Sequence, residues 1–368
     1  MPSFSELHNL GQSVWFDFIR RSLITSGELK ALVAQGVRGV TSNPAIFEKA
    51  IAGSSDYDEE IKALAKAGLS VEALYETLAI KDIQLAADAL APVYRSTAGR
   101  DGYVSLEVSP FLANDADGTI AEARRLFQAV GRPNLMIKIP ATAAGLPAIT
   151  ASIAAGVNVN GTLIFGLENY KAVADAYMAG LEQLALQGPS VRGGHRVDAV
   201  ASVASFFVSR VDTAVDPELE KRGARDLLGK IGIANCKIAY AEYRRIFSRP
   251  RWSELSAQGA RTQRVLWAST STKNPAYPDT LYVDELIGPE TVNTLPPETV
   301  KAFIDHGAAA ETLTRDPEGA GRQIRRLAEL GIDFEAVTRR LQEEGVAAFA
   351  KPFRALLDSI ATKLERLA

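Results

Sequence analysis

The feature that most constrains the fold of this 368-residue chain is the alternation of short apolar runs with longer amphipathic stretches. Eight runs have the length and composition of buried strands, at residues 14–19, 37–43, 102–108, 134–142, 157–165, 199–208, 265–269 and 280–286. Helical periodicity fills most of the intervals, including an insertion at 56–67 and 71–94. Such alternation indicates a parallel sheet, and eight units suit a closed barrel. We therefore predict a single α/β (β/α)8 TIM barrel.

The C-terminal region, residues 297–368, is rich in Glu, Arg and Leu and has helical periodicity, with a turn signal at 331–333. No glycine-serine linker and no low-complexity tract precedes it. We predict that these helices pack on the barrel and that residues 1–368 form one domain.

Composition narrows the classes of function. The net charge of −3 and the pI near 5.8 provide no basic field for nucleic acid and no polybasic patch for a membrane. The N-terminus lacks a signal-peptide pattern, and no run of about 18 apolar residues occurs. A single cysteine, Cys236, excludes an intramolecular disulfide, and His8, His195 and His306 are too scattered for a metal cluster. We predict a cytoplasmic protein, a monomer or homodimer, that needs no metal or other cofactor.

One of the predicted strands carries a lysine. Lys138 lies between Ile137 and Ile139 in the run 134–142, where an unpaired ammonium group would cost several kcal/mol. Such surroundings favour the neutral amine, which is the form that a Schiff-base nucleophile requires. Taken alone, the run fits better with an edge-strand lysine whose head reaches water.

Parity along the strands reverses that preference. Side chains two residues apart in a strand share a face, so polar residues can be assigned to the barrel lumen. The lumen face then holds Trp15 and Asp17, Thr41 and Asn43, Ser105 and Glu107, Asn134, Met136 and Lys138, Asn158, Asn160 and Thr162, and Val203, Ser205 and Phe207. Barrel enzymes place their active sites at the C-terminal ends of the strands, where we expect these polar groups.

Five blocks of sequence resemble transaldolases. They read GVTSNPAIF (39–47), IKIPAT (137–142), GVNVNGTLIF (156–165), SVASFFVSRVD (202–212) and ASTSTKNP (268–275), the last in the form of the longer bacterial members. Each block is modest alone, but their order is that of the family. The resemblance covers the chain from Asp17 to about His306.

The resemblance implies a lysine Schiff base that moves a dihydroxyacetone unit between sugar phosphates. Lys138 matches the nucleophile and Asp17 the acid/base that handles the proton of the C4 hydroxyl. Glu107 and Thr162 match the pair that holds a water for dehydration of the carbinolamine. The plainer alternatives are a turn-capping role for Asp17 and a structural ion pair between Glu107 and Lys138.

The resemblance also implies the substrate contacts. Asn43, Asn160 and Ser205 match positions that bind hydroxyls of the three-carbon unit; alternatively, they form a polar network that satisfies the barrel mouth.

Arg210 matches the phosphate-binding arginine, although a lone arginine after a strand is more often a surface ion-pair member. Shorter members place a second arginine soon after the position of Ser269, where this chain reads TSTK (270–273), and we interpret Lys273 as its replacement. Phe207 stands where a tyrosine would put a phenol near the water, and an apolar ring there favours retention of the intermediate.

Two competing functions fit the same residues. A fructose-6-phosphate aldolase-like lyase would use Lys138 but release free dihydroxyacetone, and a non-catalytic barrel would only bind sugar phosphates. A nucleotide enzyme has little support, because residues 223–230 have one residue too many for a P-loop and lack its Ser/Thr.

Overall fold

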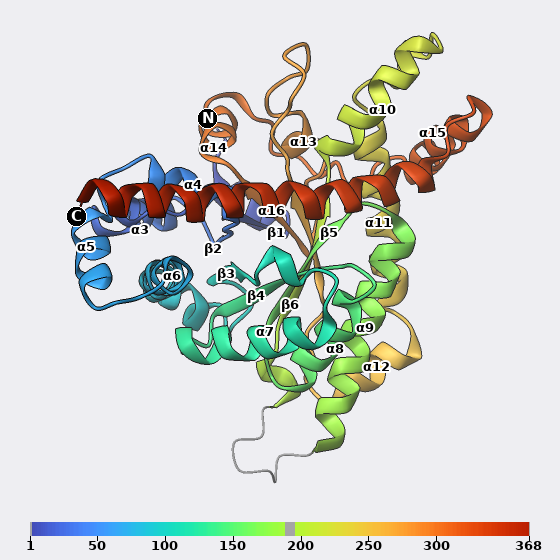
Figure 1. Ribbon diagram of the computed structural model, residues 1–368. Coiled ribbons are helices and arrows are strands. Elements are labelled where there is room, and N and C mark those ends of the chain that lie inside the picture. The colour runs from blue at the N-terminus through green and yellow to red at the C-terminus, as the bar shows by residue number, and fades with distance from the viewer. Residues whose placement is uncertain (1, 188–195, 368) are drawn as a thin grey trace.

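The computed structural model describes residues 2–187 and 196–367, in which eight parallel strands close into a barrel in the order β1 to β8 (Figure 1). The fold class is therefore confirmed. The strands are β1 Gln12–Phe16, β2 Gly39–Val40, β3 Tyr103–Glu107, β4 Leu135–Pro140, β5 Val159–Ile164, β6 Ser202–Phe207, β7 Arg264–Ala268 and β8 Thr291–Leu295. The first seven overlap the predicted runs. His195 lies outside the described residues.

The predicted eighth strand is wrong. Residues 280–286 form a turn and the short helix α13 (Leu281–Asp284), and the barrel is closed by β8 further along the chain. Tertiary hydrogen bonds override the local β propensity, because the Tyr282 hydroxyl donates to Asp212 at 2.7 Å and the Thr280 hydroxyl to Asp284 at 2.6 Å.

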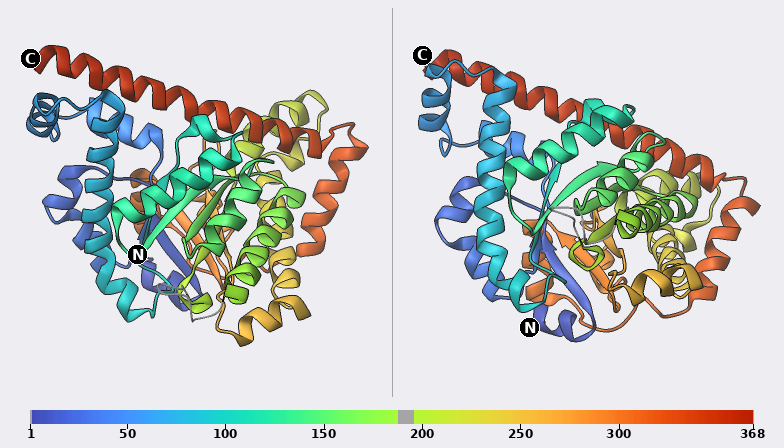
Figure 2. Two further views of the ribbon diagram at one scale, coloured as in Figure 1. Left: turned by 60° about the horizontal axis from the view of Figure 1, so that its bottom comes forward. Right: turned by 90° about the horizontal axis from the view of Figure 1, so that it is seen from below.

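Helices surround the strands, and Figure 2 shows this ring with α16 along one edge. The α-helices are α1 Phe4–Asn9, α2 Arg21–Thr25, α3 Glu28–Ala34, α4 Pro44–Ala52, α5 Asp58–Lys66, α6 Val71–Ser96, α7 Ala116–Val130, α8 Gly145–Ala154, α9 Leu167–Gln187, α10 Ser209–Lys221, α11 Ile231–Ile246, α12 Pro250–Ala257, α14 Pro297–His306, α15 Pro317–Glu329 and α16 Phe334–Leu367. Short 3₁₀ turns lie at η1 Pro110–Leu112, η2 Val197–Ala199 and η3 Arg225–Leu227. Several helices begin at side-chain caps; Ser70 caps α6 and Asp115 caps α7.

The barrel lumen is filled at its N-terminal end. Trp15, Met136 and Leu266 belong to one buried cluster inside the barrel, as parity predicts for Trp15 and Met136. Beside them, Arg264 and Asp101 form a buried ion pair with N and O 2.8 Å apart. The remaining space therefore lies at the C-terminal ends of the strands.

Asn134 and Asn158 share the predicted face but do not reach that end, which corrects our expectation. The Asn134 amide donates to the carbonyls of Ala87 and Gly102 at 2.9 and 2.7 Å. The Asn158 amide donates to Leu135 O at 2.9 Å. Both asparagines satisfy backbone carbonyls near the start of their strands.

Strand β5 contains an irregularity that breaks the side-chain alternation. The register shifts between Gly161 and Ile164, and Leu163 has a left-handed φ of 61°. Strict alternation would place Leu163 on the face opposite Thr162, but its side chain joins the inner cluster with Phe165 and Phe207.

The C-terminal helix α16 crosses the molecule from α15 to α5 (Figure 1). Its start follows Gly331, at the turn predicted for residues 331–333. The Gln342 amide donates to Ala141 O and Leu163 O, at the C-terminal ends of β4 and β5, at 2.8 and 3.1 Å. Near the other end of the helix, Lys363 forms an ion pair with Asp58 at 2.6 Å. The helix therefore lies over the mouth of the barrel.

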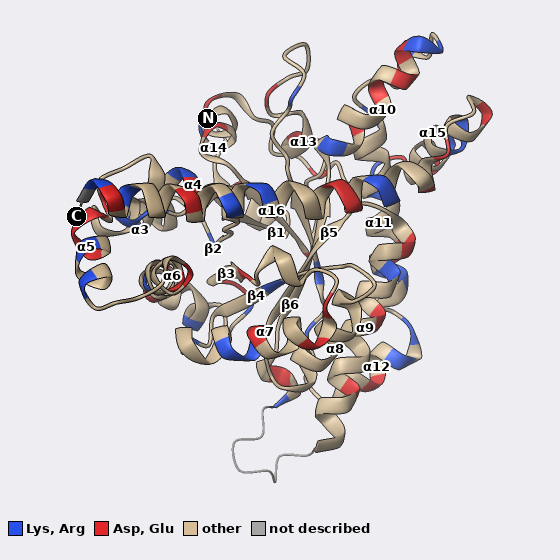
Figure 3. Ribbon diagram, in the orientation of Figure 1, with Lys and Arg blue, Asp and Glu red and all other residues tan. Residues whose placement is uncertain are grey.

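Charged residues of both signs are interspersed over the outer helices (Figure 3), in keeping with the small net charge of −3. Within the described residues, we find no helix with the length and apolar character needed to cross a membrane.

Candidate active site

Lys138 is buried in the centre of the candidate site. It stands on β4 in register with Glu107 of β3 and Asn160 of β5. Its Nζ atom lies 3.5 Å from Glu107 Oε2 and 3.4 Å from the backbone oxygen of Ser42. These distances exceed the 2.7–2.9 Å or so of a strong charge-assisted hydrogen bond, so the amine is only loosely held. The ring of Phe349 on α16 covers it, with its centroid 5.2 Å from Nζ.

The two groups expected to hold a water flank Lys138 on neighbouring strands. Burial raises the pKa of Glu107 to about 7, although the nearby Lys138 opposes the shift. Among the described residues, Glu107 Oε1 and Thr162 Oγ1 are buried without a hydrogen-bond partner. Because buried polar atoms normally have partners, these two are suited to bind a water or a substrate atom.

Asp17 lies directly after β1, and its backbone N–H continues the sheet by donating to Leu295 O at 2.8 Å. The Thr41 hydroxyl donates to Asp17 Oδ1 at 2.6 Å, and Thr294 Oγ1 lies 2.6 Å from Thr41 Oγ1. Burial raises the pKa of Asp17, opposed by the Thr41 hydrogen bond and by Lys138. The Asp17 carboxylate accepts a hydrogen bond from the Thr41 hydroxyl but none from a backbone N–H of the described residues, so within them it does not cap a turn.

Eight of the ten predicted site residues line one cavity of about 200 Å³. They are Asp17, Asn43, Lys138, Thr162, Ser205, Phe207, Arg210 and Lys273. Of the other two, Glu107 borders an adjacent cavity of about 320 Å³, and Asn160 is fully buried beside Ser205.

The three residues expected to bind hydroxyls differ in their availability. Asn160 already uses both ends of its amide, accepting from Ser205 Oγ at 2.6 Å and donating to Ser105 Oγ at 3.1 Å. These contacts are those of a polar network, which a ligand hydroxyl would have to join. Asn43 accepts from Ile46 N at 3.0 Å and thereby caps α4, which leaves its amide nitrogen for the cavity.

Two cations stand at the rim of the cavity. Arg210 lies in the first turn of α10, with its Cζ atom 5.3 Å from the centroid of Phe207, and burial lowers the pKa of its guanidinium. It makes no ion pair and no side-chain hydrogen bond with any described residue, unlike the surface ion-pair member considered above. Lys273 is exposed and donates to Ser271 Oγ at 2.6 Å.

Sequence reasoning missed several residues that line the cavity. Parity places Thr41 on the lumen face, and Thr41 lies inside the block 39–47, but it was not assigned to the site. Thr294 lies in β8, which the sequence analysis misplaces, and Glu298 lies just after it in the first turn of α14. Phe349 comes from α16, and nothing in its local sequence indicates that it reaches Lys138.

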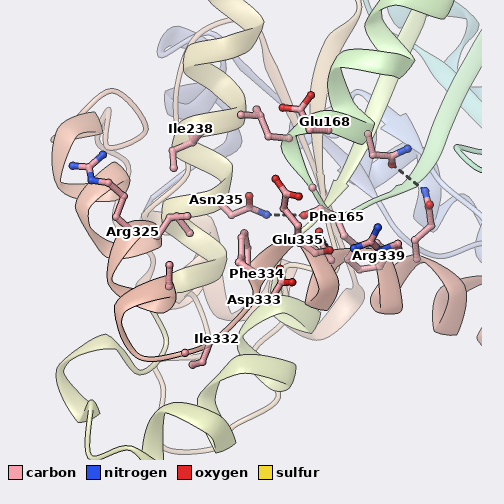
Figure 4. Close-up of a pocket in the computed structure, with 18 residues that line it drawn as sticks. Phe165, Glu168, Asn235, Ile238, Arg325, Ile332, Asp333, Phe334, Glu335 and Arg339 are labelled. Atoms are coloured by element: carbon pink, nitrogen blue, oxygen red, sulfur yellow. Dashed lines mark hydrogen bonds between the residues drawn. The ribbon is translucent and has the colours of Figure 1, made fainter.

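A larger cavity of about 910 Å³ lies between α9, α11, α15 and α16. Figure 4 shows Asn235 pointing toward Phe165, whose carbonyl accepts its amide hydrogen at 2.8 Å. None of the predicted site residues lines this cavity. Its arginines, Arg325 and Arg339, are exposed, so the chemistry is better placed at Lys138. No group of three or more His, Cys, Asp or Glu side chains suited to a metal ion occurs in the described part of the chain.

Comparison with known proteins identifies the family of this chain. The family described as Transaldolase/Fructose-6-phosphate aldolase matches residues 14–360. The chain belongs to this family. The transaldolase/fructose-6-phosphate aldolase match extends beyond the resemblance described above and includes most of α16.

Relatives named transaldolase match this family member over nearly its whole length. The protein from Parafrankia sp. is 50% identical, with 98% of this chain and 97% of the relative covered. The protein from Neisseria gonorrhoeae is 49% identical, with 97% and 99% covered. The one from Trichodesmium erythraeum is 48% identical, with 98% and 97% covered.

Proposed function

We propose that this protein is a transaldolase that transfers a dihydroxyacetone unit from sedoheptulose 7-phosphate to glyceraldehyde 3-phosphate. The products are erythrose 4-phosphate and fructose 6-phosphate, and the reaction is reversible. The observation that carries the proposal is that the buried Lys138 amine and the Asp17 carboxyl open into the same cavity. Membership of the family supports the same reaction.

The reaction begins at Lys138. Its neutral amine attacks the ketone carbon of the donor, and the resulting carbinolamine loses water to form an iminium. Glu107 can supply or accept a proton in this step near neutral pH, because its pKa is raised to about 7. Its unpartnered Oε1 and the Thr162 hydroxyl would hold the departing water.

Cleavage needs a base at the C4 hydroxyl. Asp17, held by Thr41, would remove this proton as the C3–C4 bond breaks, and the bonding electrons pass to the iminium to give an enamine. The aldose leaves. The enamine carbon then attacks the carbonyl of the acceptor aldose, and Asp17 returns its proton to the new alkoxide, which leaves the product bound to Lys138 as an iminium. Water held by Glu107 and Thr162 would add to C2 of this iminium and lose a proton, and the C–N bond would break to release the product and the Lys138 amine.

Substrate binding follows from the remaining residues of the cavity. Arg210, whose planar guanidinium group makes no ion pair or side-chain hydrogen bond with the described residues, would bind the phosphate, and the exposed Lys273 would add a second, weaker contact. Asn43 and Ser205, backed by Asn160, would bind hydroxyls of the three-carbon unit.

A lyase that releases free dihydroxyacetone is the second candidate, since the family description includes fructose-6-phosphate aldolase. The apolar Phe207 favours the transferase, because it offers no proton near the intermediate. The two reactions are separated with fructose 6-phosphate as the donor. We expect glyceraldehyde 3-phosphate to form catalytically only with erythrose 4-phosphate present. Sustained dihydroxyacetone release at the transfer rate would establish the lyase.

Borohydride reduction with fructose 6-phosphate distinguishes an enzyme from a barrel that only binds sugar phosphates. The Lys138 peptide should gain a three-carbon unit, and Lys138→Ala should prevent both labelling and transfer. Labelling at another lysine would refute the assignment of the nucleophile.

The iminium itself supplies the electron sink, so prolonged chelation should leave the transfer rate unchanged. We further propose a cytoplasmic enzyme, in line with its single cysteine, acting as a monomer or homodimer. We also assign residues 297–368 to the barrel domain, because Phe349 lines the cavity. Light scattering would determine the oligomeric state.

A further inference from the structure

One face of α16 is built against the barrel mouth. Gln342, Gly345, Phe349 and Phe353 follow a helical spacing that places them on the same side. Gln342 binds the ends of β4 and β5. A Cβ atom on Gly345 would meet Leu163 at 3.0 Å, so the helix lies close to β5 at this point.

This approach brings Phe349 onto the nucleophile. Its ring is only 7% exposed, lines the cavity and lies over Lys138 Nζ at 5.2 Å from the centroid. Phe207 stands in the same cavity wall, from β6. Apolar rings from a strand and from a distant helix therefore enclose the carbon atoms that would be bonded to Lys138.

Enclosure matters most after cleavage. To lose its three-carbon unit without an acceptor, the enamine must first take a proton at carbon and become an iminium. Water oxygen then adds to C2, a base takes the water proton, and the C–N bond breaks to return the Lys138 amine and free dihydroxyacetone. Water must also reach C2 at the end of a transfer, so the step peculiar to dihydroxyacetone release is the delivery of a proton to the enamine carbon.

We infer that Phe349 is a specificity-determining residue that keeps proton donors, including water, away from the enamine carbon on Lys138, and so directs the enamine to an aldehyde acceptor rather than to protonation and release. This inference rests on the proposed transaldolase function. In addition to packing on the barrel, α16 would then influence whether the three-carbon unit is transferred to an acceptor or released as dihydroxyacetone.

The chain offers a matched control one helical turn further on. Phe353 lies on the same face of α16, but its ring packs at 5.4 Å from Tyr75 and is not over Lys138. Phe353→Ala also removes a phenyl ring from α16, but Phe353 borders the adjacent cavity and not the one that contains Lys138. A general loosening of α16 would affect both variants alike.

The test measures dihydroxyacetone released per transfer to erythrose 4-phosphate, with fructose 6-phosphate as donor. We expect Phe349→Ala to raise this ratio about tenfold, equivalent to about 1.4 kcal/mol of lost discrimination. Phe349→Leu, which restores apolar volume, should bring the ratio back to within about threefold of the unsubstituted protein. Phe353→Ala should leave it unchanged.

The inference is overturned if folded Phe349→Ala keeps the original ratio, or if Phe353→Ala raises it equally. Should Phe349→Ala fail to fold, Phe349→Val replaces it, with a smaller rise expected and an unchanged ratio counting against us. Failure of the proposed function is distinguishable, because the unsubstituted protein would then show no acceptor-dependent transfer.

Discussion

Glu107 and Lys138 face each other in register on adjacent strands, with Oε2 and Nζ 3.5 Å apart and both side chains buried. The spacing permits attraction without a tight ion pair. Burial outweighs the influence of Lys138 and raises the pKa of Glu107 to about 7, so its carboxyl can exchange a proton near neutral pH, as the proposed loss of water from the carbinolamine requires.

This raised pKa predicts a pH-dependent effect of Glu107→Gln on stability. A carboxyl with a higher pKa in the folded protein stabilises the fold below its ordinary pKa of 4.5, and this contribution is lost as the pH rises through about 7. From pH 5 to pH 8, the unfolding free energy of Glu107→Gln should rise relative to that of the unsubstituted protein by up to about 3 kcal/mol. Urea unfolding at both pH values measures it.

The control for Glu107→Gln is Glu59→Gln, because the Glu59 side chain is 90% exposed. It should show no such shift. A pH-independent difference between Glu107→Gln and the unsubstituted protein would contradict the burial argument.

Thr162→Val should separate function from stability. The Thr162 hydroxyl is buried without a partner among the described residues, so its removal should leave the free energy of unfolding unchanged or raise it by about 1 kcal/mol. Imine formation should slow, by about tenfold or more, because the water loses one of its expected holders. Borohydride trapping rates and urea unfolding measure the two effects. Loss of stability together with unchanged trapping would assign Thr162 a structural role.

Asp17→Asn should slow cleavage by about 10²-fold or more while imine formation continues, because the amide keeps the shape of the side chain but cannot relay the proton. Single-turnover formation of glyceraldehyde 3-phosphate measures cleavage, and borohydride trapping measures the imine. Thr41→Val should cause a smaller loss, since it removes only the hydroxyl that holds Asp17. Equal loss of trapping and cleavage in Asp17→Asn would contradict a role confined to the C4 proton.

Arg210→Ala should raise KM for phosphorylated donors by about 10- to 100-fold, the value of one or more charge-assisted hydrogen bonds. Arg210→Lys should recover only part of the lost affinity, because an ammonium group keeps the charge but cannot donate two parallel hydrogen bonds to phosphate as a planar guanidinium does. Lys273→Ala should have a smaller effect, since Lys273 is exposed. Unphosphorylated fructose as the donor provides the control, and an equal effect on it would exclude phosphate recognition by Arg210.

Much of this protein could be predicted from local patterns. The alternation of strands and helices determined the barrel, because sheet and helix periodicities are properties of neighbouring residues. Parity also placed Lys138, Glu107 and Asp17 correctly on the inner face, since successive side chains in a strand point to opposite sides. The family resemblance then supplied the chemistry.

Tertiary structure decided what depends on contacts between distant segments. Residues 280–286 have a strand-like composition, yet hydrogen bonds such as that from Tyr282 to Asp212 hold them in a turn and a short helix. Leu163 has a left-handed φ, which breaks the alternation of side chains that parity assumes. Leucine rarely adopts this backbone conformation, so its identity does not predict it.

The placement of Phe349 over Lys138 is the clearest case. Helical periodicity predicts that Phe349 lies on an apolar face, but not which surface that face covers. The answer depends on Gln342 bonding to the ends of β4 and β5, and on a glycine at 345 that allows the helix to come close. Local sequence thus determined the barrel and the buried lysine on β4, whereas only long-range packing determined what encloses that lysine.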